Sequence, residues 1–201
     1  MASYRTLAEP LHSEIEIKKS RFIGCIEPIG SHAAGLERVA DLWREHPEAR
    51  HVCYAMLVAG QVRQSDDGEP SGTAARPMLN VLQHKGLDYV LATVVRYFGG
   101  IKLGAGGLVR AYTQAISEPL QQAEFVEVRP QAQAGIRFDY AHEALVRHLA
   151  EQAGLTLKVE YQQQVLAWLE GEAAPLNACL QQLQSQTRGA LVIADAESQS
   201  S

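Results

Sequence analysis

Strand-like and helix-like hydrophobic patterns alternate along the first half of the chain. Between residues 14 and 28, a period-2 pattern followed by an apolar segment predicts a β-hairpin. Ser31 suits the N-cap of a helix, and apolar residues at helical spacing extend from it until Pro47. A strand is predicted at residues 51–58, and a short helix at 78–84.

The strongest strand pattern lies at residues 88–98, where β-branched and aromatic residues occupy both the odd and the even positions. Such a run predicts a strand that is covered on both faces. It ends in a glycine-rich segment that leads into a helix, which Pro119 should end. A further short strand is predicted at residues 125–128.

A second series of elements follows Pro130. Residues 131–134 are predicted to be a linker, because they are glutamine and alanine and follow that proline. The next segments read as strand, helix, strand, strand, helix and strand, the βαββαβ order of a ferredoxin-like sandwich. The pattern therefore predicts an α+β protein with domains at residues 1–130 and 134–201.

The net charge of −5 restricts the partners that the chain can attract. Residues 1–130 contain 14 Lys and Arg against 15 Asp and Glu, whereas the remainder contains 4 against 8. Nucleic-acid binding usually requires a basic surface. The charge distribution excludes attraction by the whole chain and leaves room for a local basic patch on the first domain.

The chain shows no pattern of a membrane or secreted protein. No apolar run reaches the roughly 20 residues that a membrane span needs, and the first residues lack the apolar core of a signal peptide. The three cysteines are odd in number and scattered, which argues against a disulfide framework. We therefore expect a cytoplasmic protein without a membrane partner.

The segment from Arg96 to Arg110 has an unusual density of glycine, five residues in nine positions. Each glycine costs about 1 kcal/mol in regular structure, so bare backbone must be needed there. A glycine turn that enters a helix directs backbone N–H groups at an anion. Arg96, Lys102 and Arg110 are expected to converge on it. The glycines are Gly99, Gly100, Gly104, Gly106 and Gly107.

Two alternatives limit this interpretation of the glycine segment. A tight turn with close helix packing explains the glycines equally well. The dinucleotide fingerprint would need glycine at position 109, where valine stands, and no Gly-Lys-Ser/Thr sequence follows. No nucleotide cofactor is expected.

The loop after residue 64 groups carboxylates with hydroxyl side chains. It does not match a calcium loop, because Met78 stands where the bidentate glutamate should be. Turns held by Asp and Ser, a binding surface, or a catalytic carboxylate remain as alternatives. The candidate binding residues of this loop are Ser65, Asp66, Asp67, Gly68 and Glu69.

Other candidates for chemistry are weaker. His51 and Cys53 share one face of a predicted strand, but no second pair completes a zinc site. His142 and His148 are six positions apart, so they do not form an HExxH motif. We therefore expect no metal, no cofactor and no catalytic residues.

Three segments resemble the signatures of the IMPACT/YigZ family: KKSRFI at residues 18–23, SDDGEPSGTA at 65–74 and RYFGGIKLGAGGLVR at 96–110. The resemblance covers about residues 14–120, and the second domain is similar to that of bacterial two-domain members by pattern only. It implies a first domain like domain IV of elongation factor G, a ribosomal-protein-like βαβ fold. The second would be like that factor's ferredoxin-like domain V. It also implies a role in translational regulation.

The leading hypothesis is a non-enzymatic regulator of translation that binds RNA, the ribosome or a translation-associated factor. Alternatives are a protein-binding module that uses the loop at 65–77, and a hydrolase that uses Asp66, Asp67 or Glu69. The expected phosphate contacts are Lys18, Lys19, Arg21, Arg76, Arg96, Lys102 and Arg110.

Overall fold

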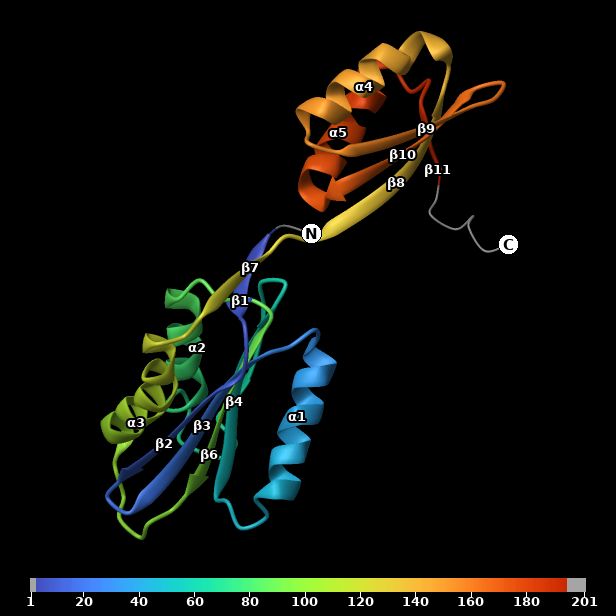
Figure 1. Cartoon of the computed structure of the whole chain (residues 1–201). Helices are drawn as coiled ribbons and strands as arrows, with labels where there is room; N and C mark the ends of the chain where they lie inside the picture. Colours follow the sequence, from blue (N-terminus) through green and yellow to red (C-terminus); the bar gives the residue numbers. More distant parts are fainter. Residues whose placement is uncertain (1–2, 195–201) are drawn as a thin grey trace. The chain divides into compact units, whose positions relative to one another are not determined.

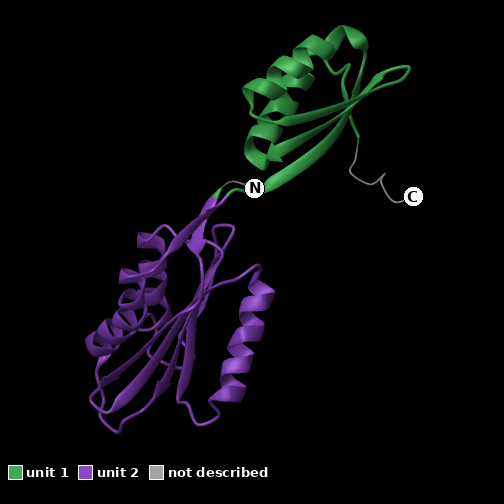
Figure 2. Ribbon diagram, in the orientation of Figure 1, with its two compact units in different colours: residues 1–3, 129–201 green, residues 4–128 purple. Residues whose placement is uncertain are grey.

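The computed structural model describes residues 3–194. The chain divides into two compact units, residues 4–128 and residues 129–201 with 1–3 (Figure 2). Each unit has its own sheet and its own hydrophobic core. The expectation of a linker at residues 131–134 was wrong. These residues form the first half of strand β8 (Gln131–Phe138), which pairs with strand β10 (Val165–Glu172).

The first unit is built on a five-stranded antiparallel sheet of order β2-β3-β6-β4-β5. Strands β3 and β4 both run antiparallel to β6, so they are parallel to each other across it, and helix α1 (His32–Glu45) connects them. This is a split βαβ unit. Its strands are β2 (Leu11–Ile17), β3 (Ser20–Pro28), β4 (His51–Val58), β5 (Gln61–Ser65) and β6 (Val90–Tyr97). A separate ribbon pairs β1 (Tyr4–Leu7) with β7 (Phe125–Val128).

Helices cover both faces of this sheet (Figure 1). Helices α2 (Ala75–His84) and α3 (Ala105–Ser117) lie on one face and α1 on the other. Val94 of β6 belongs to the larger core beneath α2 and α3, whereas its neighbour Val95 packs with Leu42 of α1. The prediction that this strand is buried on both faces is confirmed.

The second unit has a four-stranded antiparallel sheet of order β11-β8-β10-β9, with two helices. Numbered within the unit, this is the 4-1-3-2 order of a ferredoxin-like sandwich, and the α+β class is confirmed. Its further elements are α4 (Glu143–Gln152), β9 (Thr156–Tyr161), β10 (Val165–Glu172), α5 (Ala173–Gln186) and β11 (Val192–Ala194). Short 3-10 turns lie at Pro119–Gln121 and Tyr140–His142.

Two strands of the first unit, β1 and β5, had not been predicted. Strand β5 is polar and mostly exposed at the edge of the sheet, so it has no hydrophobic period. Helix α2 begins at Ala75, three residues before the predicted start at residue 78, so it takes in the end of the predicted loop. Within residues 3–194, no helix combines the length and the apolar character that crossing a membrane requires.

Candidate functional site

Asp66 holds the loop before α2 in place. Its two carboxylate oxygens accept hydrogen bonds from the backbone N–H groups of Gly72 (2.7 Å), Ala74 (3.1 Å) and Ala75 (2.8 Å). These contacts satisfy the first donors of α2, which has no side-chain cap at its own N-cap position. Asp66 therefore stabilises the loop and the start of α2.

Asp67 attaches the same loop to strand β4. Its carboxylate accepts a hydrogen bond from the N–H of Val52 at 2.7 Å, and its carbonyl oxygen lies 2.6 Å from Nδ1 of His51. Its own N–H donates to the hydroxyl of Ser65. Asp67 and Gly68 both have a positive φ, so the chain turns sharply here. Both aspartates are thus engaged, and residues 3–194 contain no group of three His, Cys, Asp or Glu that could hold a metal.

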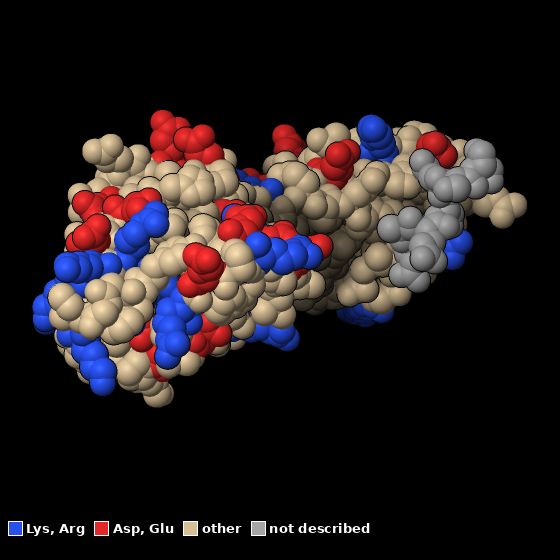
Figure 3. Space-filling view, turned by 90° about the horizontal axis from the view of Figure 1, so that it is seen from below, with Lys and Arg blue, Asp and Glu red and all other residues tan. Residues whose placement is uncertain are grey.

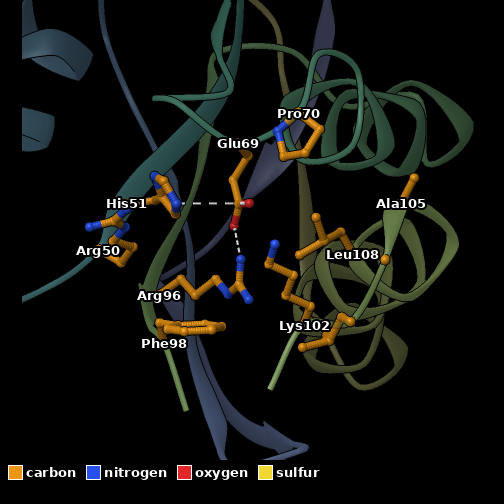
Figure 4. A pocket seen from close by; sticks show the side chains of 11 residues that line it. Arg50, His51, Glu69, Pro70, Arg96, Phe98, Lys102, Ala105 and Leu108 are labelled. Carbon is orange, nitrogen blue, oxygen red and sulfur yellow. Dashed lines mark hydrogen bonds and ion pairs between the residues drawn. The ribbon is translucent and has the colours of Figure 1, made fainter. Parts of the chain in front are cut away.

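Glu69 turns inward from this loop and is only 7% exposed. Its Oε1 pairs with Nη1 of Arg96 at 2.5 Å and accepts a hydrogen bond from the hydroxyl of Tyr112 at 2.8 Å. Its other oxygen lies 3.8 Å from Nε2 of His51 (Figure 4). A buried carboxylate requires such partners, because desolvation disfavours its charged form.

Below Glu69, Tyr112 and Cys53 extend the network into the core. The Sγ atom of Cys53 lies 3.3 Å from the hydroxyl oxygen of Tyr112. Burial raises the pKa of both groups well above their ordinary values. Both stay neutral near pH 7, so the Tyr112 hydroxyl keeps the proton that it donates to Glu69.

A pocket of about 400 Å³ opens above this network, between the end of β6 and the start of α3. In Figure 4, the side chain of Lys102 extends from the glycine turn toward Arg96 and Glu69, and His51 faces Glu69 from the other side. The pocket thus combines charged groups with apolar walls. Its lining comprises Arg50, His51, Glu69, Pro70, Arg96, Phe98, Lys102, Leu103, Gly104, Ala105 and Leu108.

The glycines of the turn serve different purposes. A side chain at Gly99 would overlap the backbone of Lys19, so close packing requires glycine there. Gly100 and Gly104 have φ values of 82° and 75°, which glycine adopts at little cost. Gly106 meets neither demand, because a Cβ there would have only an ordinary contact with Arg110.

Three of the expected phosphate contacts lie elsewhere or are already paired. Arg21 is paired with Glu14 at 2.8 Å and stands opposite Tyr97, on the α1 face of the sheet. Arg76 lines a separate groove between α2 and α3. Arg96 lies on the same face of β6 as Val94, but it is buried against Glu69.

The expected convergence of Arg96 and Arg110 on one anion was therefore wrong. Arg110 is exposed, does not line the pocket, and lies in the second turn of α3. Its Nη1 atom folds back to within 3.6 Å of the position that a Cβ on Gly106 would occupy. The guanidinium thus remains at the start of the helix.

Five exposed cations surround the glycine turn and have no ion pair within residues 3–194. Lys18 and Lys19 form the β2–β3 turn, whose backbone packs on Gly99. Arg50 and Lys102 line the pocket, and the guanidinium of Arg110 lies beside Gly106. We name these five residues the basic corner. Figure 3 shows several Lys and Arg side chains on the left of the view, interspersed with Asp and Glu side chains.

Sequence reasoning named Glu69, Arg96 and Lys102 as candidates but overlooked other residues of the pocket. His51 was set aside because no second metal ligand accompanied it, and its partner Glu69 lies 18 positions later in the sequence. Tyr112 lies among the buried apolar residues of α3, and its position in the sequence gives no sign of the hydrogen bond to Glu69. The overlooked residues of the lining are Arg50, His51, Pro70, Phe98, Leu103, Ala105 and Leu108, and Tyr112 was overlooked below it.

Comparisons with known proteins place this geometry in a family. The family model described as the Impact N-terminal domain matches residues 18–120. The chain is 36% identical over 197 residues to the IMPACT family member YigZ of Escherichia coli, covering 95% of this chain and 97% of that protein. It is 43% identical over 161 residues to an IMPACT family member of Haemophilus influenzae, covering 75% and 76%.

A solved structure is similar over nearly the whole chain. It is described only as that of a hypothetical protein and is 35% identical, with a TM-score of 0.67. The match covers 99% of this chain and 100% of that one. The likeness therefore includes both units.

Proposed function

This chain belongs to the IMPACT family, and on that premise we propose that it is a cytoplasmic, non-catalytic regulator of translation that binds an RNA backbone through the basic corner. One observation carries the proposal. The five cations of the corner are exposed and unpaired within residues 3–194, although the first unit as a whole has no excess of positive charge. Cations without partners on a neutral domain suit contacts with phosphate groups.

The surroundings of the corner favour a single strand. Phe98 is 49% exposed beside the pocket and offers a face on which a base can stack. Stacking on an aromatic side chain and contacts with the backbone recognise RNA with little preference for sequence. The ribosome contains such RNA, so it is included in the proposal.

The alternatives have less support. A hydrolytic role for the loop at 65–77 needs free carboxylates, whereas those of Asp66 and Asp67 accept backbone hydrogen bonds and Glu69 is paired with Arg96. A protein-binding role for the loop loses the same three carboxylates as contacts. A binding role for the corner needs none of these groups.

The experiment is a titration of a labelled single-stranded RNA at several salt concentrations. Arg110→Ala and Lys102→Gln should each weaken binding and reduce the slope of log K against log salt by roughly 0.7. Arg63→Ala is the matched control, because Arg63 is an exposed arginine on the edge strand β5. Circular dichroism checks that each variant is folded.

The proposal fails if the wild type does not bind RNA at low salt. It also fails if Arg63→Ala weakens binding as much as Arg110→Ala does. In either case the protein-partner alternative would lead.

A further inference from the structure

The pocket beside the basic corner contains the open N-terminus of a 13-residue helix, α3. The N-cap, Gly104, has no side chain that could bond the first N–H groups. The first helical hydrogen bond runs from the N–H of Leu108 to the carbonyl of Gly104 at 3.0 Å. The N–H groups of residues 105–107 precede it, and the helix dipole adds partial positive charge to them.

Arg96 provides an independent indication of a ligand. It is only 5% exposed and lines the same pocket, yet its Nε has no hydrogen-bond partner. Its Nη1 is bound to Glu69, and its Nη2 lies 3.5 Å from the hydroxyl of Ser20. Buried donors are almost always paired in proteins, so a guanidinium with this unmet donor capacity in the wall of a pocket is suited to an acceptor that a ligand brings.

The charges in the pocket indicate how negative that ligand should be. Glu69 balances Arg96, which leaves Arg50 and Lys102 without a counter-charge in the lining. The helix terminus adds about half a charge more. A phosphate monoester carries close to two negative charges at pH 7, whereas a diester of the RNA backbone carries one. The balance favours a monoester.

The remaining lining fits a nucleoside attached to that phosphate. Phe98, Leu103 and Leu108 supply apolar surface, and the volume of about 400 Å³ lies in the range of small-molecule sites. His51 and Glu69 add polar groups to the lining, and a ribose offers hydroxyls that can form hydrogen bonds with such groups.

We propose that this pocket binds the terminal phosphate monoester of a nucleotide, with the phosphate at the start of α3 on the side of the pocket that Lys102 and Arg96 face. The nucleotide is either a free 5′-mononucleotide or the 5′-phosphorylated end of an RNA. The second source rests on the proposed function, and the first does not.

Calorimetric titration of the full chain with adenosine 5′-monophosphate and with adenosine tests the pocket directly. The monophosphate should bind at least about tenfold more tightly, because charge-assisted hydrogen bonds contribute more than neutral ones. Equal affinities, or no binding of the monophosphate at millimolar concentration, would overturn the proposal.

Ala105→Glu is the informative variant. Ala105 is exposed, lines the pocket and is the first residue of α3, where a carboxylate suits the helix dipole. The variant should remain folded and lose most of its affinity for the monophosphate, because its charge occupies the anion position. Lys102→Gln should weaken binding about tenfold, and Arg63→Ala should not change it. Unchanged affinity in Ala105→Glu would refute the site.

A third arm compares short RNAs of one sequence that carry either a 5′-phosphate or a 5′-hydroxyl. A preference for the phosphate that Ala105→Glu abolishes supports the RNA end as the source. If the monophosphate binds but the two RNAs bind alike, the free mononucleotide is the ligand. RNA binding that depends on Lys18 and Lys19, with no response to the monophosphate, would overturn this inference and leave the proposed function intact.

Discussion

Arg96 contributes a buried charge on which the candidate site depends. Because Glu69 is its partner, Arg96→Met should leave a carboxylate in the core without a counter-charge. Removal of one partner of a buried ion pair typically destabilises a protein by about 3–5 kcal/mol. We expect a loss of this size in the free energy of unfolding, measured in urea.

Arg21→Met is the matched control for this prediction. Its ion pair with Glu14 is exposed, and such pairs contribute at most about 1 kcal/mol. The double variant Arg96→Met with Glu69→Gln should recover part of the loss, since no charge then remains in the core. If Arg96→Met lowers the free energy of unfolding no more than Arg21→Met does, the buried pair of Arg96 and Glu69 does not stabilise the fold.

Cys25 should make stability depend on alkaline pH. Burial, reinforced by nearby Glu27, raises its pKa from an ordinary value near 9 to about 11. The folded state therefore retains a proton that the unfolded state loses first. The protonated thiol of Cys25 makes its full contribution to the free energy of unfolding below about pH 9. This contribution is lost as the pH rises toward 11, with a slope of about 1.4 kcal/mol per pH unit.

Urea unfolding between pH 8.5 and 11 measures this dependence, with Cys25→Ala as the comparison. The variant should lose less stability over that range than the wild type. Burial also raises the pKa values of Cys53, Cys179 and Tyr112, so both proteins should still lose stability over this range, and the two curves should differ only by the contribution of Cys25. Parallel curves for the two proteins would contradict the prediction.

At the scale of elements, the glycine turn gives opposite expectations for two similar changes. Gly99→Ala should destabilise the fold by about 1–3 kcal/mol, because its Cβ would overlap the backbone of Lys19. Gly106→Ala should stabilise it by about 0.5–1 kcal/mol, since nothing obstructs the new methyl group and alanine favours the helix. Thermal unfolding of the two variants checks the signs. A loss in Gly106→Ala would show that α3 needs glycine there.

The period of the hydrophobic pattern and the content of glycine allowed much of the region from β6 to α3 to be predicted. The buried character of β6, the glycine turn and the apolar stripe of α3 follow from short-range patterns, and the structure contains all three. The contacts of Glu69 do not follow from such patterns. Its partners Arg96 and Tyr112 lie 27 and 43 positions away, and only the folded chain brings them together.

Charge misled the sequence interpretation in a similar way. A list of basic residues cannot distinguish Arg21 and Arg96, which are paired, from Lys102, which has no ion pair within residues 3–194. Partners and sheet faces decide the difference, because a one-residue step along a strand moves a side chain to the other face. This is why Arg21 and Phe22 lie on opposite faces of β3.

At the scale of the molecule, the two units have separate cores, and the last prediction concerns their independence. Leu169 is fully buried in the core of the second unit, so Leu169→Ala should destabilise that unit by about 2–5 kcal/mol. Hydrogen exchange should then show lost protection in β8 and β10, whereas β3 and β6 should keep theirs. RNA binding at the basic corner should not change at temperatures where the first unit stays folded. Equal loss of protection in both units would mean that the chain unfolds as one cooperative structure despite its two cores.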